Sequence, residues 1–308
     1  MPTSKAQFAQ ETGADGSFQR QESAFRRWVT DAGEGETFPA EAGRYQLYVS
    51  LACPWAHRTL IARALKGLEG AIGVSVVDPL RDARGWAFTA RTGPDPCEGF
   101  EFLSEAYEKT DPSFSGRVTV PVLWDTQTKQ IVNNESADLL RMLNRAFDAY
   151  ATNPDLDLYP THCEREIDAL NARIYDTVNN GVYKAGFATT QTAYSQAYAQ
   201  LFETLDALDA RLATQRYLCG KRPTEADWRL FTTLVRFDPV YYVHFKCNAQ
   251  RIADYPHLSG YLRDLYQTPG VAETVDFAQI KAHYYRTHEK LNPSGIVPEG
   301  PRQDLSAP

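Results

Sequence analysis

The sequence predicts an α/β domain with the element order βαβ-ββα, followed by an all-helical domain. Up to about residue 150, short runs with strand periodicity alternate with helical patterns, whereas beyond residue 160 only helical stripes are found. The chain has 308 residues, a length that fits roughly two domains. Because 43% of the residues are hydrophobic, the chain can bury a sizeable core.

Composition shifts place the expected boundaries. We expect a polar N-terminal extension over residues 1–43, the α/β domain over 44–150, and a linker over 151–160. The helical domain should occupy 161–291, and a proline-rich extended tail should occupy 292–308. The extension is expected to lie on the domain surface through its four large aromatic side chains, Phe18, Phe25, Trp28 and Phe38.

The βαβ half begins with an apolar strand at 45–49. A helix is expected over 54–66, and alternating apolar residues predict a second strand over 72–76. Residues 78–116, rich in Gly, Pro and Asp, are expected to form an irregular insert, and loops of that length are often functional.

The ββα half begins with a strand signal at 118–124. A proline inside a strand normally indicates an edge or a break, so a cis peptide at Val120–Pro121 is expected to turn the chain and expose the Val120 backbone. A short strand at 130–132 follows. Residues 133–136 then lead into a helix whose buried face holds Leu139, Leu140, Leu143 and Phe147.

The second domain shows three apolar helical stripes. The first runs from Ile167 to Val178 and the second from Tyr198 to Leu212. The third begins at Thr224, which is expected to cap a helix that buries Trp228 and its neighbours, with Asp227 reaching back as in a capping box.

Charge and composition exclude several classes of function. A net charge of −7 and a pI near 5.5 argue against nucleic acid or an anionic membrane as main partners. The chain has no apolar run long enough to span a bilayer and no apolar N-terminal signal, so a cytoplasmic location is expected. The spacing of the histidines and cysteines predicts neither a metal site nor a disulfide framework.

Cys53 is the most informative residue. It follows the strand at 45–49 and precedes Pro54, which suits the first position of a helix. A cysteine at a helix N-terminus meets unpaired N–H groups and the positive end of the helix dipole, which favour the thiolate. Position 56 is Ala rather than a second cysteine. A disulfide formed by Cys53 should therefore need an external thiol to open it.

Several segments together resemble the glutathionyl-hydroquinone reductases, the Xi class of glutathione transferases. The resemblance covers about residues 20–301 and implies a thioredoxin-like N-terminal domain with a helical C-terminal transferase domain. It rests on the segments 50–59 (SLACPWAHRT), 120–122 (VPV), 134–136 (NES), 238–248 (DPVYYVHFKCN) and 292–298 (NPSGIVP).

The resemblance implies a reaction. Cys53 would attack the sulfur of a glutathionyl-hydroquinone, chlorinated or not, release the hydroquinone and keep glutathione as a mixed disulfide. A second glutathione would release oxidised glutathione and restore the thiol, in agreement with the absence of a cysteine at position 56. The family also implies a homodimer formed mainly by the helical domain, and a role in xenobiotic degradation. Glutathione would be a co-substrate, and no metal is implied.

Five residues are expected to bind glutathione. Glu135 would pair with the γ-glutamyl ammonium, and Ser136 with the helix N-terminus would hold the adjacent carboxylate. Val120 would bond the cysteinyl backbone. Trp86 would pack beside glutathione and Arg117 would grip a carboxylate. The plainer alternatives are a simple helix cap for Glu135 and Ser136, and a surface aromatic and a solvated cation for Trp86 and Arg117.

The hydroquinone is expected to meet aromatic residues between the two domains. Tyr242 and Tyr285 are predicted to donate a proton to the leaving phenolate oxygen or to stabilise it. Tyr183, Tyr241 and His244 are expected to line the pocket. With 17 tyrosines in the chain, a core role remains the alternative for each of them, as it does for His244.

Two other functions remain open. One is a monothiol glutathione oxidoreductase of omega type, which reduces dehydroascorbate or mixed disulfides. The other is a non-catalytic, transferase-like binding domain, which would have no use for an activated thiol. Conjugation by a transferase is a weaker hypothesis, because it needs a hydroxyl that holds the glutathione thiolate, whereas a cysteine would form the mixed disulfide.

Overall fold

The computed structural model describes residues 11–31 and 38–306, and these residues divide into two compact units. Unit 1 contains residues 21–31, 38–157 and 273–283, and unit 2 contains residues 11–20, 158–272 and 284–306. Residues 1–10, 32–37 and 307–308, which belong to the predicted extension and tail, lie outside the described residues. In the part of the chain that is described, no helix has the length and apolar character needed to cross a membrane.

Unit 1 is built on a four-stranded sheet in the order β2-β1-β3-β4. β1 pairs in parallel with β2 and antiparallel with β3, which in turn pairs antiparallel with β4. This is the predicted βαβ-ββα arrangement, and the predicted bounds of the first strand, first helix and second strand are confirmed. The elements are β1 (Tyr45–Val49), α1 (Pro54–Lys66), β2 (Ile72–Val76), α2 (Ser104–Thr110), β3 (Val122–Asp125), β4 (Gln130–Asn133) and α3 (Ser136–Arg145).

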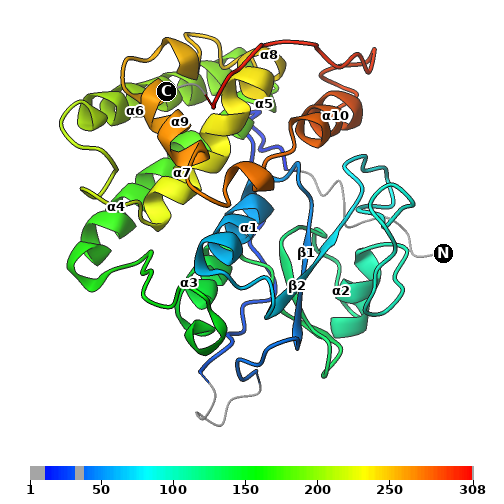
Figure 1. The fold of residues 1–308 in the computed structure, drawn as a ribbon. Helices are drawn as coiled ribbons and strands as arrows, with labels where there is room; N and C mark the ends of the chain where they lie inside the picture. The colour runs from blue at the N-terminus through cyan, green and yellow to red at the C-terminus, as the bar shows by residue number, and fades with distance from the viewer. Residues whose placement is uncertain (1–10, 32–37, 307–308) are drawn as a thin grey trace. The chain divides into compact units, whose positions relative to one another are not determined.

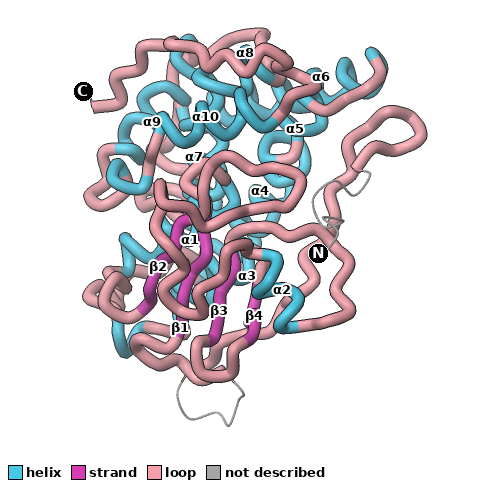
Figure 2. Tube along the Cα trace, turned by 90° about the vertical axis from the view of Figure 1, so that its right-hand side faces the viewer, coloured by secondary structure: helices cyan, strands magenta, loops and turns pink. Residues whose placement is uncertain are grey.

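Helices cover both faces of this sheet. α1 and α3 pack together on one face, and α2 lies on the other (Figures 1 and 2). The insert contributes to this second layer, because Phe88 contacts Tyr48 of β1 and Phe100 contacts Trp124 of β3, with ring centroids 5.5 and 5.6 Å apart. The insert was expected to be irregular, and this expectation is wrong over α2. The short helix buries Ala106 and Tyr107, and an apolar pattern of two residues is too short to signal it.

The third strand begins later than predicted. The Val120–Pro121 peptide is cis, as expected, and β3 starts only at Val122. Proline has no N–H to give to a strand ladder, so pairing begins after it. Phe147 is buried as predicted but lies beyond the end of α3.

The N-terminal extension covers the open edge of the sheet. Residues 25–27 run antiparallel to β4: the Asn134 N–H donates to Phe25 O at 3.0 Å and the Arg27 N–H donates to Val132 O at 3.1 Å. An uncovered edge strand would offer free backbone groups to other chains. Of the four aromatics predicted to hold the extension, Phe18 and Phe38 are buried and Phe25 half-buried, but Trp28 is 44% exposed. The expectation for Trp28 is wrong, and the adjacent Val29 is the residue that is buried.

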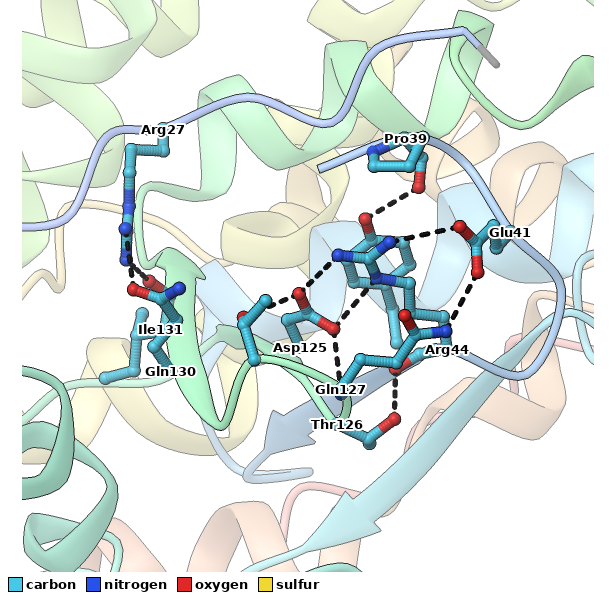
Figure 3. A network of polar contacts seen from close by, with 11 residues as sticks. Arg27, Pro39, Glu41, Arg44, Asp125, Thr126, Gln127, Gln130 and Ile131 are labelled. Carbon is cyan, nitrogen blue, oxygen red and sulfur yellow. Dashed lines mark hydrogen bonds and ion pairs between the residues drawn. The ribbon is translucent and has the colours of Figure 1, made fainter. Parts of the chain in front are cut away.

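A buried ion pair joins the entry of β1 to the end of β3. The Arg44 guanidinium donates to both carboxylate oxygens of Asp125, at 2.9 and 2.7 Å, and its third nitrogen donates to Glu41 (Figure 3). Asp125 also accepts from the Gln127 N–H and the Thr128 hydroxyl. These contacts fix the turn between β3 and β4.

Unit 2 is helical, as predicted. The capping box is confirmed at α7, where the backbone N–H and the hydroxyl of Thr224 donate to Asp227 at 2.7 and 3.1 Å. The first stripe does not form one helix, because α4 ends at Ile174 and continues as a π-helical turn, Tyr175–Asn179. A second π-helical turn, Phe237–Tyr241, follows α7. The helices are α4 (Glu164–Ile174), α5 (Gly181–Gly186), α6 (Gln191–Leu212), α7 (Glu225–Arg236), α8 (Tyr242–His244), α9 (Leu258–Tyr266) and α10 (Phe277–Thr287), and no helix follows in residues 288–306.

Candidate active site

In unit 1, Cys53 lies where the sequence predicts it, at the N-cap of α1 with Pro54 in the first turn. The residue has extended backbone angles and its side chain is half-exposed. Its Sγ lies 3.5 Å from Val120 O, next to the cis peptide. The first turn of α1 contains no acidic residue. The positive end of the helix dipole therefore acts on the sulfur without an opposing carboxylate from the first turn of the helix.

Three of the other four cysteines are less suited to act as thiolates, because burial raises the pKa of Cys219 to about 12 and raises the pKa of Cys97 and Cys247 as well. Cys163 is half-exposed and is the N-cap residue of α4, but it lies in unit 2. Its backbone is helical where that of Cys53 is extended, and the first turn of α4 contains two glutamates.

Glu135 and Ser136 start α3, and both are engaged in the fold. Glu135 is the N-cap: one carboxylate oxygen accepts from the Ala137 N–H at 3.1 Å and the other from the Ser23 hydroxyl at 2.9 Å. The Ser136 hydroxyl accepts from the buried Arg58 guanidinium at 3.2 Å. Each carboxylate oxygen and the serine hydroxyl retain further hydrogen-bonding capacity, so capping and ligand binding are compatible.

Arg58 links the two helix starts. It is 1% exposed, and its guanidinium carbon lies 4.5 Å from the centroid of the Trp55 ring, two residues after Cys53. Its hydrogen bond to Ser136 thus joins the first turn of α1 to the first turn of α3. The sequence alone favours a purely structural role for Arg58, and no local pattern indicates this connection.

Trp86 is held by residues far from it in the sequence. Its ring stacks on His283 at 5.2 Å, and the His283 Nδ1 lies 2.7 Å from Pro79 O. The indole N–H is buried and has no hydrogen-bond partner among the described residues. A buried indole donor without a partner can serve a ligand acceptor. Arg117 is half-buried, and its backbone N–H donates to the Gln21 side chain.

Several contacts at this site come from segments that no local motif could identify. Ser23 bonds Glu135 from 112 positions away. His57, one turn after Cys53, lies 2.7 Å from the Thr274 hydroxyl. His283, nine residues after Thr274, stacks on the Trp86 ring. Among the described residues, no group of three or more His, Cys, Asp or Glu side chains is arranged to hold a metal ion.

In unit 2, Tyr183 and Tyr241 lie in one aromatic cluster with Tyr284. The Tyr284 hydroxyl lies 2.5 Å from that of Tyr183 and 2.9 Å from that of Tyr241. Tyr241 and Tyr284 are fully buried, and burial raises their pKa well above the usual value for tyrosine. Their hydroxyls therefore keep their protons at neutral pH. Tyr284 was not predicted from the sequence, although it adjoins Tyr285.

Tyr285 and His244 adjoin this cluster, since the His244 ring contacts both Tyr284 and Tyr285. The Tyr285 hydroxyl donates to Pro239 O at 3.1 Å, so its proton is engaged in a hydrogen bond within the protein. His244 packs on the Tyr285 ring at 4.7 Å, and its Nε2 lies 3.1 Å from the His288 Nδ1. Burial lowers the pKa of His244 to about 4, so its imidazole is neutral at neutral pH. Tyr242 is half-buried, and its hydroxyl makes no hydrogen bond within the described part of the chain.

Comparisons with known proteins match both halves of the chain. Residues 52–146 match the model of the glutathione S-transferase N-terminal domain, and residues 191–264 match that of the C-terminal domain. The chain is 57% identical over 302 residues to the glutathionyl-hydroquinone reductase YqjG of Escherichia coli (strain K12), with 95% of this chain and 92% of the relative covered. It is 51% identical over 292 residues to the glutathionyl-hydroquinone reductase PcpF of Sphingobium chlorophenolicum, covering 94% and 91%.

Solved structures agree with these matches. The glutathione-bound structure of the E. coli protein superimposes with a TM-score of 0.89 at 55% identity, covering 92% of this chain and 95% of that one. A Xi-class glutathione transferase from Natrialba magadii gives a TM-score of 0.91 at 51% identity, covering 96% and 94%.

Proposed function

This chain belongs to the glutathione transferases and, within them, to the Xi-class glutathionyl-hydroquinone reductases, and on that premise we propose that it removes glutathione from glutathionyl-hydroquinones through a mixed disulfide at Cys53. The observation that carries the proposal is a half-exposed cysteine at the N-terminus of α1 with alanine three positions later. The two reductases reported above do not favour the omega-type oxidoreductase or the non-catalytic domain.

The first step breaks a carbon–sulfur bond. The substrate reacts as its keto tautomer, in which the ring carbon that bears sulfur has gained a proton and the neighbouring oxygen has lost one. The Cys53 thiolate attacks the glutathione sulfur, so that a disulfide forms and the carbon–sulfur electron pair moves through the ring to that oxygen. Protonation of the oxygen gives the hydroquinone. The two sulfur atoms are oxidised and the ring is reduced.

The second step restores the thiol. A glutathione thiolate attacks the glutathione sulfur of the mixed disulfide, oxidised glutathione leaves, and Cys53 departs as the thiolate. No residue of the chain takes the place of this glutathione, because position 56 is Ala.

The glutathione half of the substrate would lie against unit 1. We assign the γ-glutamyl ammonium to Glu135 and its carboxylate to Ser136 with the N-terminus of α3. The Val120 backbone would bond the cysteinyl part, in keeping with the 3.5 Å approach of Cys53 to Val120 O. The unpartnered Trp86 N–H and the Arg117 guanidinium would serve the remaining oxygen atoms.

The hydroquinone ring would contact the aromatic cluster of unit 2, where burial favours Tyr183 as the proton donor. Tyr241 and Tyr284 are fully buried, whereas Tyr183, whose hydroxyl lies 2.5 Å from that of Tyr284, is half-buried. Of these three linked tyrosines, Tyr183 is therefore the one that a substrate can reach. Tyr242, which is also half-buried, remains the second candidate, and Tyr285 and His244 would line the pocket.

Phenylalanine substitutions separate these roles. Tyr183→Phe should lower kcat for glutathionyl-hydroquinone by about 100-fold, the size of a lost general acid. Tyr285→Phe should change kcat by less than about threefold, because its hydroxyl proton already serves Pro239. Steady-state kinetics of Tyr183→Phe, Tyr242→Phe and Tyr285→Phe show which substitution lowers kcat most. A larger loss in Tyr285→Phe than in Tyr183→Phe would contradict the assignment.

The intermediate itself provides the direct test of the function. Mixing the protein with glutathionyl-hydroquinone in the absence of free glutathione should release one hydroquinone and leave one glutathione on the protein. Peptide mass spectrometry should place this adduct on Cys53, and added glutathione should remove it. Protein without an adduct, or an adduct on another cysteine, would disprove the proposal.

We further propose a cytoplasmic enzyme that acts in xenobiotic degradation and forms a homodimer, mainly through the helical unit. The homodimer is supported by the family implied by the sequence. Light scattering coupled to gel filtration measures its mass, and a monomer at micromolar concentration would contradict it.

A further inference from the structure

The N-terminal loop 11–20 is not used by the reaction described above. In this loop the Gln19 N–H donates to Glu11 O at 2.8 Å and Thr12 bridges to Phe18, so the two ends of the loop meet. The sequence indicates only that this region is polar with occasional aromatics. The structure shows that it is a closed loop belonging to unit 2, together with Tyr183.

Two hydrogen bonds hold the loop against the start of α6. The Thr189 N–H donates to Gly16 O at 3.0 Å, and the Thr190 hydroxyl donates to Asp15 O at 2.9 Å. Gly16 has a φ of +82°, and a Cβ there would lie 2.6 Å from the Thr190 methyl carbon. Only glycine fits this close approach without strain. The loop therefore has a fixed position on the α5–α6 region.

This position brings Arg20 against Tyr183. The Arg20 guanidinium carbon lies 4.9 Å from the centroid of the Tyr183 ring and 5.3 Å from that of Phe18. The Arg20 Nε donates to the buried Asn180 Oδ1 at 2.6 Å, which fixes the guanidinium. Phe18 itself lies 6.3 Å from Tyr183 in a stacked arrangement. The phenol thus has a positioned cation at its face.

We propose that Arg20 is a positioning residue for proton donation by Tyr183. This inference rests on the proposed function. A cation over the ring is attracted to its π-electrons, and the attraction grows as the phenol oxygen becomes negative. Arg20 therefore favours the state in which the Tyr183 proton has passed to the hydroquinone oxygen, and it holds the ring in place for the transfer. The proton moves from one oxygen to the other with no change in oxidation state, and Tyr183 is reprotonated from Tyr284 or water.

Two substrates separate this role from a merely structural one. Glutathionyl-hydroquinone requires protonation of its leaving oxygen, whereas the mixed disulfide of glutathione and thionitrobenzoate releases a thiolate that needs no proton. Arg20→Met should lower kcat for the first by about 10-fold and leave the second unchanged. Arg20→Lys, which keeps the charge, should recover part of the loss. Arg216→Met is the matched control, since Arg216 lies 5.3 Å from the Tyr217 ring and the reaction does not use it.

A double-mutant cycle decides whether Arg20 acts through Tyr183. In the Tyr183→Phe background, the added Arg20→Met change should have no further effect on kcat. The inference would be overturned if Arg20→Met lowered kcat equally for both substrates or left kcat unchanged. It would also be overturned if Arg20→Met lowered kcat as much in the Tyr183→Phe background as in the wild type. Failure of the wild-type protein to turn over glutathionyl-hydroquinone would instead refute the proposed function, so the two failures are distinguishable.

Discussion

Cys53→Ser is expected to abolish reductive release of hydroquinone, with kcat lowered by about 10³-fold or more, as for the loss of a catalytic nucleophile. The serine hydroxyl is isosteric but is not ionised at neutral pH, and it cannot form a disulfide. The variant should therefore release no hydroquinone and carry no glutathione after mixing. Steady-state assays and intact-protein mass spectrometry measure both results.

The matched control is Cys163→Ser. Cys163 is half-exposed and lies at the N-cap of a helix, as Cys53 does, but its backbone is helical, two glutamates follow it in the first turn, and it belongs to unit 2. If the helix N-terminus alone made a thiol catalytic, the two substitutions would behave alike. We expect full activity in Cys163→Ser, because Val120 and the α3 N-terminus, the groups proposed to bind glutathione, lie with Cys53 in unit 1. Substantial activity retained in Cys53→Ser would refute the proposed mechanism.

Binding of glutathione should survive this substitution. The groups proposed to hold it, Glu135 and Ser136 among them, are fixed by bonds that do not involve the Cys53 sulfur. Titration calorimetry with glutathione should therefore give a similar affinity for Cys53→Ser and the wild type. A variant that binds glutathione but does not react would assign the defect to the sulfur rather than to folding.

The sequence predicts the framework of unit 1 well because its signals are local. A five-residue run with four apolar residues and a proline after Cys53 predict β1 and the start of α1, and in the structure Gly67 follows the last residue of α1. The later start of β3 follows from Pro121, whose missing N–H outweighs the apolar character of the residues before it. By contrast, the helix at 104–110 has only two buried positions, which leaves no periodicity to detect.

The site is predicted only where its residues lie in a recognisable pattern. Cys53 follows from a strand, a proline and a helix that are contiguous in sequence. The residues that surround these predicted positions do not follow from the sequence. Ser23, Thr274 and His283 are far away along the chain and meet Glu135, His57 and Trp86 only in the tertiary fold. Similarly, Tyr284 cannot be distinguished from Tyr285 in sequence, and only their hydrogen bonds show that one joins Tyr183 while the other binds Pro239.

Asp125→Asn is expected to destabilise unit 1 by about 3–5 kcal/mol, because it removes the buried countercharge of Arg44 and leaves only its ion pair with the partly exposed Glu41. The side chains of Arg44 and Asp125 are 6% and 0% exposed, so water cannot replace the lost carboxylate. Asparagine keeps an oxygen that can accept from Thr128, which limits the change to the charge. Thermal and urea unfolding measure the loss, and the exposed pair Arg216–Asp264 provides the control, since Asp264→Asn should cost at most about 1 kcal/mol.

The same pair predicts a dependence of stability on pH. Burial alone would raise the pKa of Asp125, but the hydrogen bonds from Arg44 and Thr128 outweigh it and hold the pKa below the ordinary value of 3.8. A carboxyl group with a depressed pKa in the folded state contributes stability above its unfolded pKa, and this contribution is lost as pH falls through the folded value. The wild type should therefore lose more stability than Asp125→Asn as the pH is lowered below about 4.

A second substitution tests whether the buried charge is the cause. Adding Arg44→Met to Asp125→Asn removes the cation that has lost its buried partner, and the double variant should be at least as stable as Asp125→Asn alone. Replacement of a buried ion pair by neutral groups is often tolerated, whereas removal of one partner is not. If the double variant lost the sum of the two single effects, the hydrogen bonds of Arg44 rather than its charge would hold the turn between β3 and β4. The effect of Asp125 would then have to be explained by its bonds to Gln127 and Thr128.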